Sequence, residues 1–194
     1  MQIPITRRLL TERCVLRYPE LSDASAMLRA LTDHRFPKTL PIASLNTVDA
    51  VIHALRERQA SWITGSALSW YVENKVGGNL IGMVRIGRTS PVADGHWNLA
   101  FWVTPERWRR GYGVEFSREV VRLAFQELGA RVVSAKAPVW NVASCALLHR
   151  VGFVEQPPSD APDVIDVQSQ PVRSYELSAE RWPSINNKLE DGRS

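Results

Sequence analysis

The amino-acid sequence predicts a single α/β (α+β) domain with a mixed central sheet. Segments with strand and helix patterns alternate in the second half of the chain, which favours parallel pairing through crossover helices. Strands in the middle of the chain are joined by hairpin-length loops, which favours antiparallel pairing. No linker or shift in composition divides the 194 residues, and a chain of this length usually forms one domain, here residues 1–194.

The first half of the chain is expected to form a strand, two helices and a strand pair. The spacing of apolar residues indicates the type of each element. Pro19 ends the first strand, Gly65 ends the second helix, and the polar turn 74–79 joins the strand pair. The expected elements are a strand at 14–18, a helix at 23–31, a loop at 34–44, a helix from 46–47 to 65, and strands at 68–73 and 80–86.

The second half begins with a dense apolar run at 97–103, which is typical of a buried strand. The longest helix is expected at 114–128, with Gly129 as its stop. The remaining expected elements are a strand at 132–137, a helix at 142–151 ended by Gly152, a strand opening at 153–154 and a last strand at 173–177. The segment 156–171, rich in proline and aspartate, forms either a long excursion in the final hairpin or a mobile loop.

Composition and charge exclude several classes of protein. The net charge is +4, and the basic residues are scattered except at 7–8 and 109–110, so nucleic-acid binding is not expected. Cys14 and Cys145 have no metal-like spacing, so no metal site is expected. No apolar run approaches the roughly 20 residues of a membrane span, and the first residues lack a signal peptide's apolar stretch. We therefore expect a cytoplasmic protein with no membrane segment.

The most informative stretch is 97–115, where a buried strand runs into a basic, glycine-bearing turn that opens the longest helix. Gly111 and Gly113 allow a ligand to approach the backbone closely. The first N–H groups of the helix lack intrahelical partners, and Arg109 and Arg110 add charge, so the turn resembles an anion site. The Gly-x-Gly pattern alone is weak, because a tight turn with solvated arginines has the same pattern.

The same stretch resembles a known family. The segment 108–113, Trp-Arg-Arg-Gly-Tyr-Gly, resembles the Q/R-x-x-G-x-G/A pyrophosphate loop of the GNAT acetyltransferases. Asn-Val-Ala-Ser at 141–144 with Gly-Phe at 152–153 is similar to an element of the branch that acetylates ribosomal-protein N-termini. Thr-Glu-Arg at 11–13 and Tyr-Glu-Leu-Ser at 175–178 match that branch's opening and closing strand. The ordered elements cover nearly the whole chain.

The resemblance implies a binding mode for acetyl-CoA, the acyl donor. In the family two parallel strands splay apart, here 99–103 and 132–137, and helices cover both faces of the sheet. Pantetheine bonds to the first strand, and pyrophosphate to the amides of 109–114. The residues that this binding mode assigns to the cofactor are Phe101, Trp102, Val103, Trp108, Arg109, Arg110, Gly111, Tyr112, Gly113, Val114, Asn141 and Ser144.

The resemblance also implies direct attack by an amine on the thioester, with no acyl-enzyme. Many relatives carry a Glu base where this chain has Asn98, which can orient a water or an amine but cannot accept a proton. Many carry a Tyr acid where this chain has Leu148, so Ser144 is the hydroxyl left to serve the thiolate. His96 is the candidate base, because histidine titrates near neutral pH, although a loop histidine is more often simply solvated.

The acceptor is expected to be a primary amine, either a peptide or protein N-terminus or a small molecule. A coenzyme A-binding module without activity is the alternative, since the usual acid–base pair is missing. Acceptor choice should depend on the first two helices and the loops 88–95 and 156–171. Four tryptophans could line the acceptor cleft or the core: Trp62, Trp70, Trp97 and Trp102. A monomer and a homodimer are both consistent with the sequence.

Overall fold

The computed structural model describes residues 3–4, 7–89, 95–157 and 170–184. Its strands are β1 (Leu9–Leu10), β2 (Cys14–Arg17), β3 (Ala67–Asn74), β4 (Leu80–Arg88), β5 (His96–Val103), β6 (Val132–Pro138), β7 (Val154–Glu155) and β8 (Val172–Ser178). Its α-helices are α1 (Ala24–Thr32), α2 (Val48–Thr64), α3 (Tyr112–Gln126) and α4 (Val142–Val151). Short 3-10 turns lie at Leu21–Asp23, Pro41–Ser44 and Pro105–Arg107.

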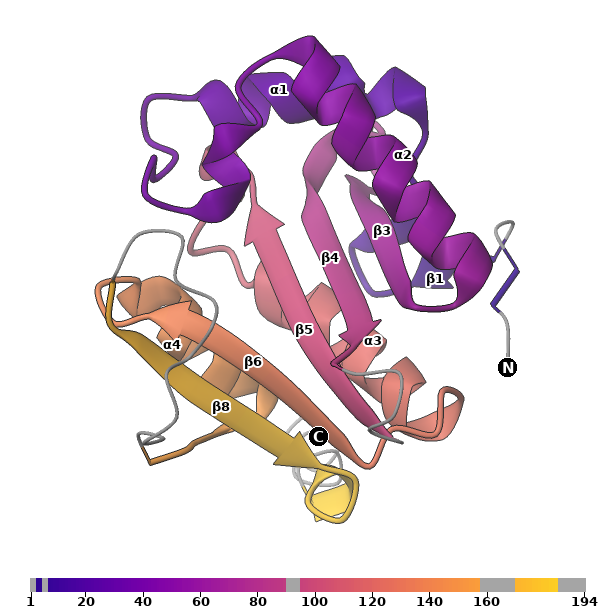
Figure 1. The fold of residues 1–194 in the computed structure, drawn as a ribbon, viewed down its shortest axis with the longest axis vertical. Coiled ribbons are helices and arrows are strands. Elements are labelled where there is room, and N and C mark those ends of the chain that lie inside the picture. Colours follow the sequence, from indigo (N-terminus) through magenta and orange to yellow (C-terminus); the bar gives the residue numbers. More distant parts are fainter. Residues whose placement is uncertain (1–2, 5–6, 90–94, 158–169, 185–194) are drawn as a thin grey trace.

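The strands form one eight-stranded sheet in the order β1-β2-β3-β4-β5-β6-β8-β7 (Figure 1). Neighbouring strands are antiparallel except for β5 and β6, which are parallel. The crossover through α3 allows this parallel pairing, because parallel neighbours cannot be joined by a hairpin. The predicted mixed sheet of an α/β domain is confirmed.

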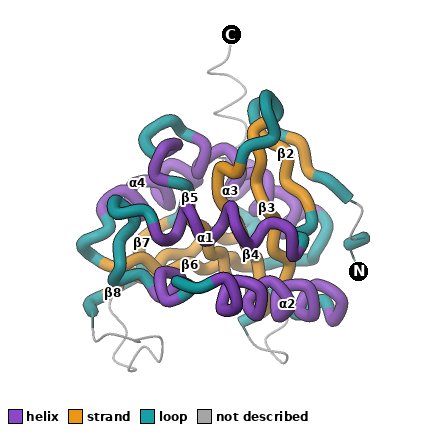
Figure 2. The backbone as a smooth tube through the Cα atoms, turned by 90° about the horizontal axis from the view of Figure 1, so that it is seen from above, coloured by secondary structure: helices purple, strands orange, loops and turns teal. Residues whose placement is uncertain are grey.

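Helices cover both faces of the sheet, as predicted (Figures 1 and 2). Helices α1 and α2 pack on one face, where they share a hydrophobic cluster with Tyr71, Met83 and Trp102. Helices α3 and α4 pack on the opposite face, in the larger cluster that includes Leu99 and Val133. We call these the α2 face and the α3 face. Alternation along each strand assigns successive side chains to opposite faces.

The four tryptophans that could have lined a cleft are core residues. Trp62, Trp70, Trp97 and Trp102 are 1%, 0%, 3% and 8% exposed. Three of the rings lie edge-on against other aromatic side chains, for example Trp62 against Trp70 at 5.1 Å between centroids, and the centre of the Trp97 ring lies 4.9 Å from the Arg88 guanidinium carbon. The indole of Trp62 also donates a hydrogen bond to the Ile3 carbonyl at 2.8 Å. The apolar positions of these residues therefore reflect packing.

The main differences from the sequence prediction are the extra strand β1 and the bounds of α3, which ends at Gln126 with Glu127, rather than Gly129, at its C-cap. The other predicted helices and strands agree with the structure to within two residues. The two-residue strand β1 was not predicted, because Leu9–Leu10 is too short to show a period. Helix α3 begins at Tyr112 rather than 114, since Gly111 in a left-handed conformation (φ 80°) occupies the N-cap position. Residues 90–94 and 158–169, which include most of both loops expected to select the acceptor, lie outside the described residues. Among the described residues, no helix is long and apolar enough to cross a membrane.

Candidate active site

The parallel strands β5 and β6 are paired only at one end. Their register joins His96 to Val132, Trp97 to Val133 and Asn98 to Ser134, and no pairing follows. Beyond Asn98, β5 is held by β4 alone and β6 by β8 alone, so the two strands diverge into an open wedge (Figure 1). We call the Asn98–Ser134 pair, where the strands part, the fork. The expected splay is confirmed, and the fork leaves the free edge of β5 without a strand partner.

The chain leaves β5 through a 3-10 turn and enters the loop 108–111, which we call the pyrophosphate loop. Arg109 (φ 58°) and Gly111 (φ 80°) are both left-handed, and Arg109 is the one non-glycine residue with positive φ among the described residues. This geometry turns the backbone amides outward at the start of α3. Within the described part of the chain, no N–H group from Arg109 to Val114 has a hydrogen-bond acceptor.

These amides and their surroundings have the features that favour an anion. Unpaired N–H groups at a helix start attract negative charge, and the helix dipole adds to that attraction. The side chains of Arg109 and Arg110 are exposed beside them. Gly113 allows α3 to approach α4 and β5, since a Cβ atom there would lie 2.5 Å from a Leu147 methyl carbon and 3.2 Å from one of Val103. A diphosphate is the type of ligand that this arrangement suits.

The segment 11–13, which joins β1 to β2, contacts the first turn of α3 and holds the pyrophosphate loop in place. Glu115, in the first turn of α3, accepts hydrogen bonds from the Arg13 amide and the Arg13 Nε, both at 2.7 Å, and from the Thr11 hydroxyl. The Arg13 guanidinium also donates to the Arg110 carbonyl at 3.0 Å and lies 4.2 Å from the centre of the Tyr112 ring. The Thr-x-Arg pattern therefore has a physical function: it fixes the loop and the helix start together.

The hydrogen bonds of Glu115 with Thr11 and Arg13, which we call the brace, predict that the free energy of unfolding depends on pH. Burial opposes ionisation of Glu115, but the bonds from Thr11 and Arg13 outweigh it and lower the pKa of Glu115 from its ordinary value of 4.5. The stabilisation is therefore present above pH 4.5 and is lost as pH falls further. Glu115→Gln should reduce the free energy of unfolding by about 1–3 kcal/mol near neutral pH.

Urea unfolding of the Glu115→Gln variant and the wild type, measured from pH 7 downward, checks this prediction. The difference between the two proteins should shrink below pH 4.5. Glu12→Gln serves as the control, since Glu12 is exposed and forms no ion pair in the described structure. A Glu115 variant as stable as the wild type at neutral pH would exclude the brace.

Two side chains of the predicted cofactor set have structural partners. The Trp108 indole donates a hydrogen bond to the Val103 carbonyl at 2.8 Å and so anchors the pyrophosphate loop to the end of β5. The Asn141 side chain caps α4 by accepting a bond from the Ser144 amide at 3.1 Å. Asn141 therefore sets the start of the helix that carries Ser144 beside the wedge.

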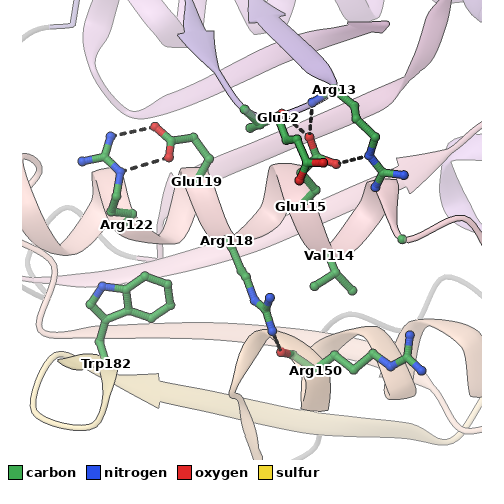
Figure 3. A pocket seen from close by; sticks show the side chains of 11 residues that line it. Glu12, Arg13, Val114, Glu115, Arg118, Glu119, Arg122, Arg150 and Trp182 are labelled. Carbon is green, nitrogen blue, oxygen red and sulfur yellow. Dashed lines mark hydrogen bonds and ion pairs between the residues drawn. The ribbon is translucent and has the colours of Figure 1, made fainter. Parts of the chain in front are cut away.

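A cavity of about 480 Å³ opens beside the first turns of α3 (Figure 3). Its wall includes Gly111 of the pyrophosphate loop, and it extends along α3 toward α4. Ion pairs line it: Arg13 with Glu115 at 2.7 Å and Arg122 with Glu119 at 2.6 Å, and Arg118 donates to the Arg150 carbonyl. The cavity therefore adjoins the pyrophosphate loop at Gly111, and its lining carries both basic and acidic side chains.

A model of the "Acetyltransferase (GNAT) domain" matches residues 13–154, which include the pyrophosphate loop, the fork and α4. The chain belongs to the GNAT acetyltransferase family. It is an N-acetyltransferase of that family.

The chain is similar to a curated protein in sequence and to several solved structures in fold. The acetyltransferase is 24% identical over 150 residues to "Uncharacterized N-acetyltransferase YoaA" of Bacillus subtilis, covering 76% of this chain and 83% of the relative. The solved structure of RimJ from Mycobacterium smegmatis, in complex with CoA-disulfide, is similar with a TM-score of 0.81 at 19% identity, over 97% of this chain and 96% of that one. A ribosomal-protein-S5-alanine acetyltransferase from Vibrio fischeri has a TM-score of 0.76 at 14% identity, over 91% and 98%.

The predicted catalytic residues of the acetyltransferase do not all lie together. Asn98 is at the fork, with its amide nitrogen 3.4 Å from both the carbonyl and the hydroxyl of Ser134. His96 is exposed on the same α2 face, two register pairs before the fork and away from the wedge. Ser144 is half-buried in the first turn of α4. Leu148, at the position where the resemblance places the family's Tyr, is fully buried and has no proton to donate.

Sequence reasoning missed Ser134, the second residue of the fork. Its hydroxyl lies 3.3 Å from the Trp97 carbonyl and within reach of Asn98. The available signal was a polar residue between Val133 and Ala135 in an otherwise apolar strand pattern. The pattern could indicate that Ser134 faces away from α3, but pairing with Asn98 depends on strand register, which the sequence does not show.

Proposed function

We propose that this acetyltransferase moves the acetyl group of acetyl-CoA directly to a primary amine at the fork. The observation that carries the proposal is the divergence of β5 from β6, followed along the chain by the free amides at the start of α3. A long, flexible donor with a diphosphate at one end fits such an arrangement. The solved RimJ relative is described in complex with CoA-disulfide, which supports the same binding mode here.

In this proposal pantetheine lies along the free edge of β5 at Phe101, Trp102 and Val103. The diphosphate accepts bonds from the amides of residues 109–114, with the Arg109 and Arg110 side chains adding charge. The thioester then lies near the fork, with α4 on one side. The acetyl carbonyl and the departing sulfur are the two atoms that need hydrogen-bond donors during transfer.

In this proposal the protons are moved without a carboxylate base or a tyrosine acid. Asn98 orients the amine or a water molecule and accepts no proton. The Ser144 hydroxyl donates toward the departing thiolate. The amine loses its proton to water or to His96, which lies on the α2 face beside Asn98. Little acid catalysis is required, because a thiol with a pKa of about 8.5 is a fair leaving group.

The proposed acceptors are peptide or protein N-termini and small primary amines. Names of solved relatives support the first class, for example the Vibrio fischeri protein that is named for ribosomal protein S5. Release of coenzyme A thiol, measured with acetyl-CoA and a panel of peptides and small amines, tests the proposal. Thiol release that depends on the amine would support transfer. Coenzyme A binding without release for any amine would identify a non-catalytic binding module instead.

The pH dependence of the rate separates the two routes for the amine proton. If water takes the proton, the rate should rise with pH toward the acceptor's own pKa, and His96→Ala should not change the profile. If His96 is the base, the profile should show an acidic limb that the variant lacks. We expect the first outcome, because His96 is exposed and lies on the closed side of the fork.

A further inference from the structure

Two arginines on the α2 face have no protein partner near the fork. Arg58 of α2 and Arg85 of β4 are each half-buried. Neither guanidinium makes an ion pair or a hydrogen bond in the part of the chain that the structure describes. The charge of Arg85 opposes that of Arg58, so the two guanidinium groups lie within electrostatic range of each other. Two like charges held together without counter-ions are a feature that packing alone does not explain.

Arg58 occupies a position that the helix pattern reserves for an apolar residue. The buried residues of α2 include Val51, Leu55 and Trp62. Arg58 follows Leu55 by three positions and precedes Trp62 by four, so it belongs to the same stripe, which faces the sheet. Its charged head therefore points under α2 and toward the α2 face rather than to open solvent.

Arg85 brings the second charge beside the fork. In the sheet register Arg85 lies between Ser69 of β3 and Ala100 of β5. Its guanidinium reaches over Gly87, since a Cβ atom on Gly87 would lie 2.9 Å from the Arg85 Nη1. Gly87 is directly opposite Asn98. The missing side chain at Gly87 thus provides the space that places a guanidinium next to the fork.

The surrounding polar groups leave both arginines available. Arg17, on the same face, forms ion pairs with Asp23 at 2.7 Å and Glu73 at 2.8 Å. These two carboxylates therefore already have a cationic partner. Glu57 attracts Arg58 more weakly than burial opposes its charge, and the Glu57 carboxylate is exposed beside His53. Ser69, directly opposite Arg85, is 1% exposed, and its hydroxyl has no partner. A third donor is therefore free at the same place.

Burial, together with the charge of Arg85, lowers the pKa of Arg58, and burial lowers the pKa of Arg85. Arginine stays protonated at neutral pH even so. Both side chains therefore hold positive charge in a recessed place, where an anion would relieve their repulsion. The fork side of that place is open, because Ala100 is exposed.

We propose that Arg58 and Arg85 bind a carboxylate or phosphate of the acceptor, a few bonds from its reacting amine. The inference rests on the proposed transfer at the fork. Opposite residues in a sheet have Cβ atoms about 5 Å apart, so an anion on the Arg85 guanidinium lies within one residue's length of an amine at Asn98. The acceptor class is then a small amino acid, or an N-terminus whose first residue is acidic.

Matched acceptor pairs test the charge requirement. Thiol release is measured with β-alanine against β-alaninamide, and with the peptide Asp-Ala-Ala-amide against Asn-Ala-Ala-amide. The anionic member of a pair should have a kcat/KM about 10- to 100-fold higher, because each charge-assisted bond contributes strongly to discrimination. The pair that shows the preference distinguishes a small-molecule acceptor from a peptide.

Variants assign the preference to the arginines. Arg85→Met and Arg58→Met should each reduce the preference to within a few-fold of unity while keeping coenzyme A affinity, and Arg85→Lys should retain part of it. Arg56→Met, on the exposed side of α2, is the matched control and should behave as the wild type. Equal use of both members by the wild type would overturn this inference and leave the transfer intact. No thiol release with any amine would overturn the proposed transfer, and this inference with it.

Discussion

Gly111→Val is expected to reduce coenzyme A affinity by at least about 100-fold. The variant should change the orientation of the backbone N–H groups that donate to the diphosphate oxygens in the proposed binding mode. Gly111 has φ 80°, a left-handed conformation that a β-branched residue avoids. The new side chain meets no close neighbour, since the nearest atom to a Cβ at this position is an Arg13 nitrogen at 3.5 Å. The protein should therefore remain folded and lose its loop geometry. Isothermal titration calorimetry with coenzyme A measures the loss.

Gly129→Val is the matched control for that variant. Gly129 is also left-handed, with φ 68°, and a Cβ atom there meets nothing within 4 Å. It follows α3 at the end far from the pyrophosphate loop, so its variant should lose about 1–2 kcal/mol of stability and no affinity. Unchanged affinity in Gly111→Val would remove the diphosphate from this loop.

The arginine side chains of the loop should matter less than its backbone. Arg109→Ala and Arg110→Ala should each weaken coenzyme A binding by less than about 3 kcal/mol, and more at low salt than at high salt. Both side chains are exposed, which leaves their charges screened by solvent. A larger loss from one of them would make that side chain, rather than the amides, the main ligand.

Ser144→Ala is expected to lower turnover by roughly 10- to 100-fold while coenzyme A affinity stays nearly intact. The hydroxyl is the part of Ser144 that can donate to the departing thiolate. Its main-chain N–H makes the capping bond to Asn141 at 3.1 Å, and alanine keeps that bond. The helix start should therefore survive, so the loss would report on chemistry. Steady-state turnover and calorimetry together separate the two effects.

Two further variants define the role of Ser144. Ser144→Thr keeps a hydroxyl and should recover part of the turnover. Asn141→Ala removes the cap instead and should cost about 1 kcal/mol of stability. Wild-type turnover in Ser144→Ala would assign the thiolate's proton to water.

Local patterns in the sequence were sufficient for the longer strands, the long helix and the glycine turn before it. Apolar spacing identifies each longer strand and helix, because a side chain's burial follows the period of its own element. Gly111 and Gly113 mark the turn for the same kind of reason: a left-handed or crowded backbone position needs glycine at that residue. The strand β1 was missed because two residues show no period.

Contacts between distant segments were decided only in the folded molecule. Thr11 and Arg13 meet Glu115 across more than a hundred residues, and the fork pairs Asn98 with Ser134. Neither contact leaves a local pattern, since each depends on strand register and on which helix crosses which strand.

Arg58 and Arg85 show most clearly that a local sequence pattern does not reveal contacts between distant segments. In sequence Arg58 is one charge in a mixed helix and Arg85 one charge in a strand. The place of Arg85 beside the fork follows from strand register and from the space above Gly87, and that of Arg58 from the packing of α2 on the sheet. Residue types and spacing thus determined the family and the glycine turn before α3, because those depend on neighbours along the chain. Tertiary structure decided what surrounds the reacting amine, because those side chains come from separate elements that only packing brings together.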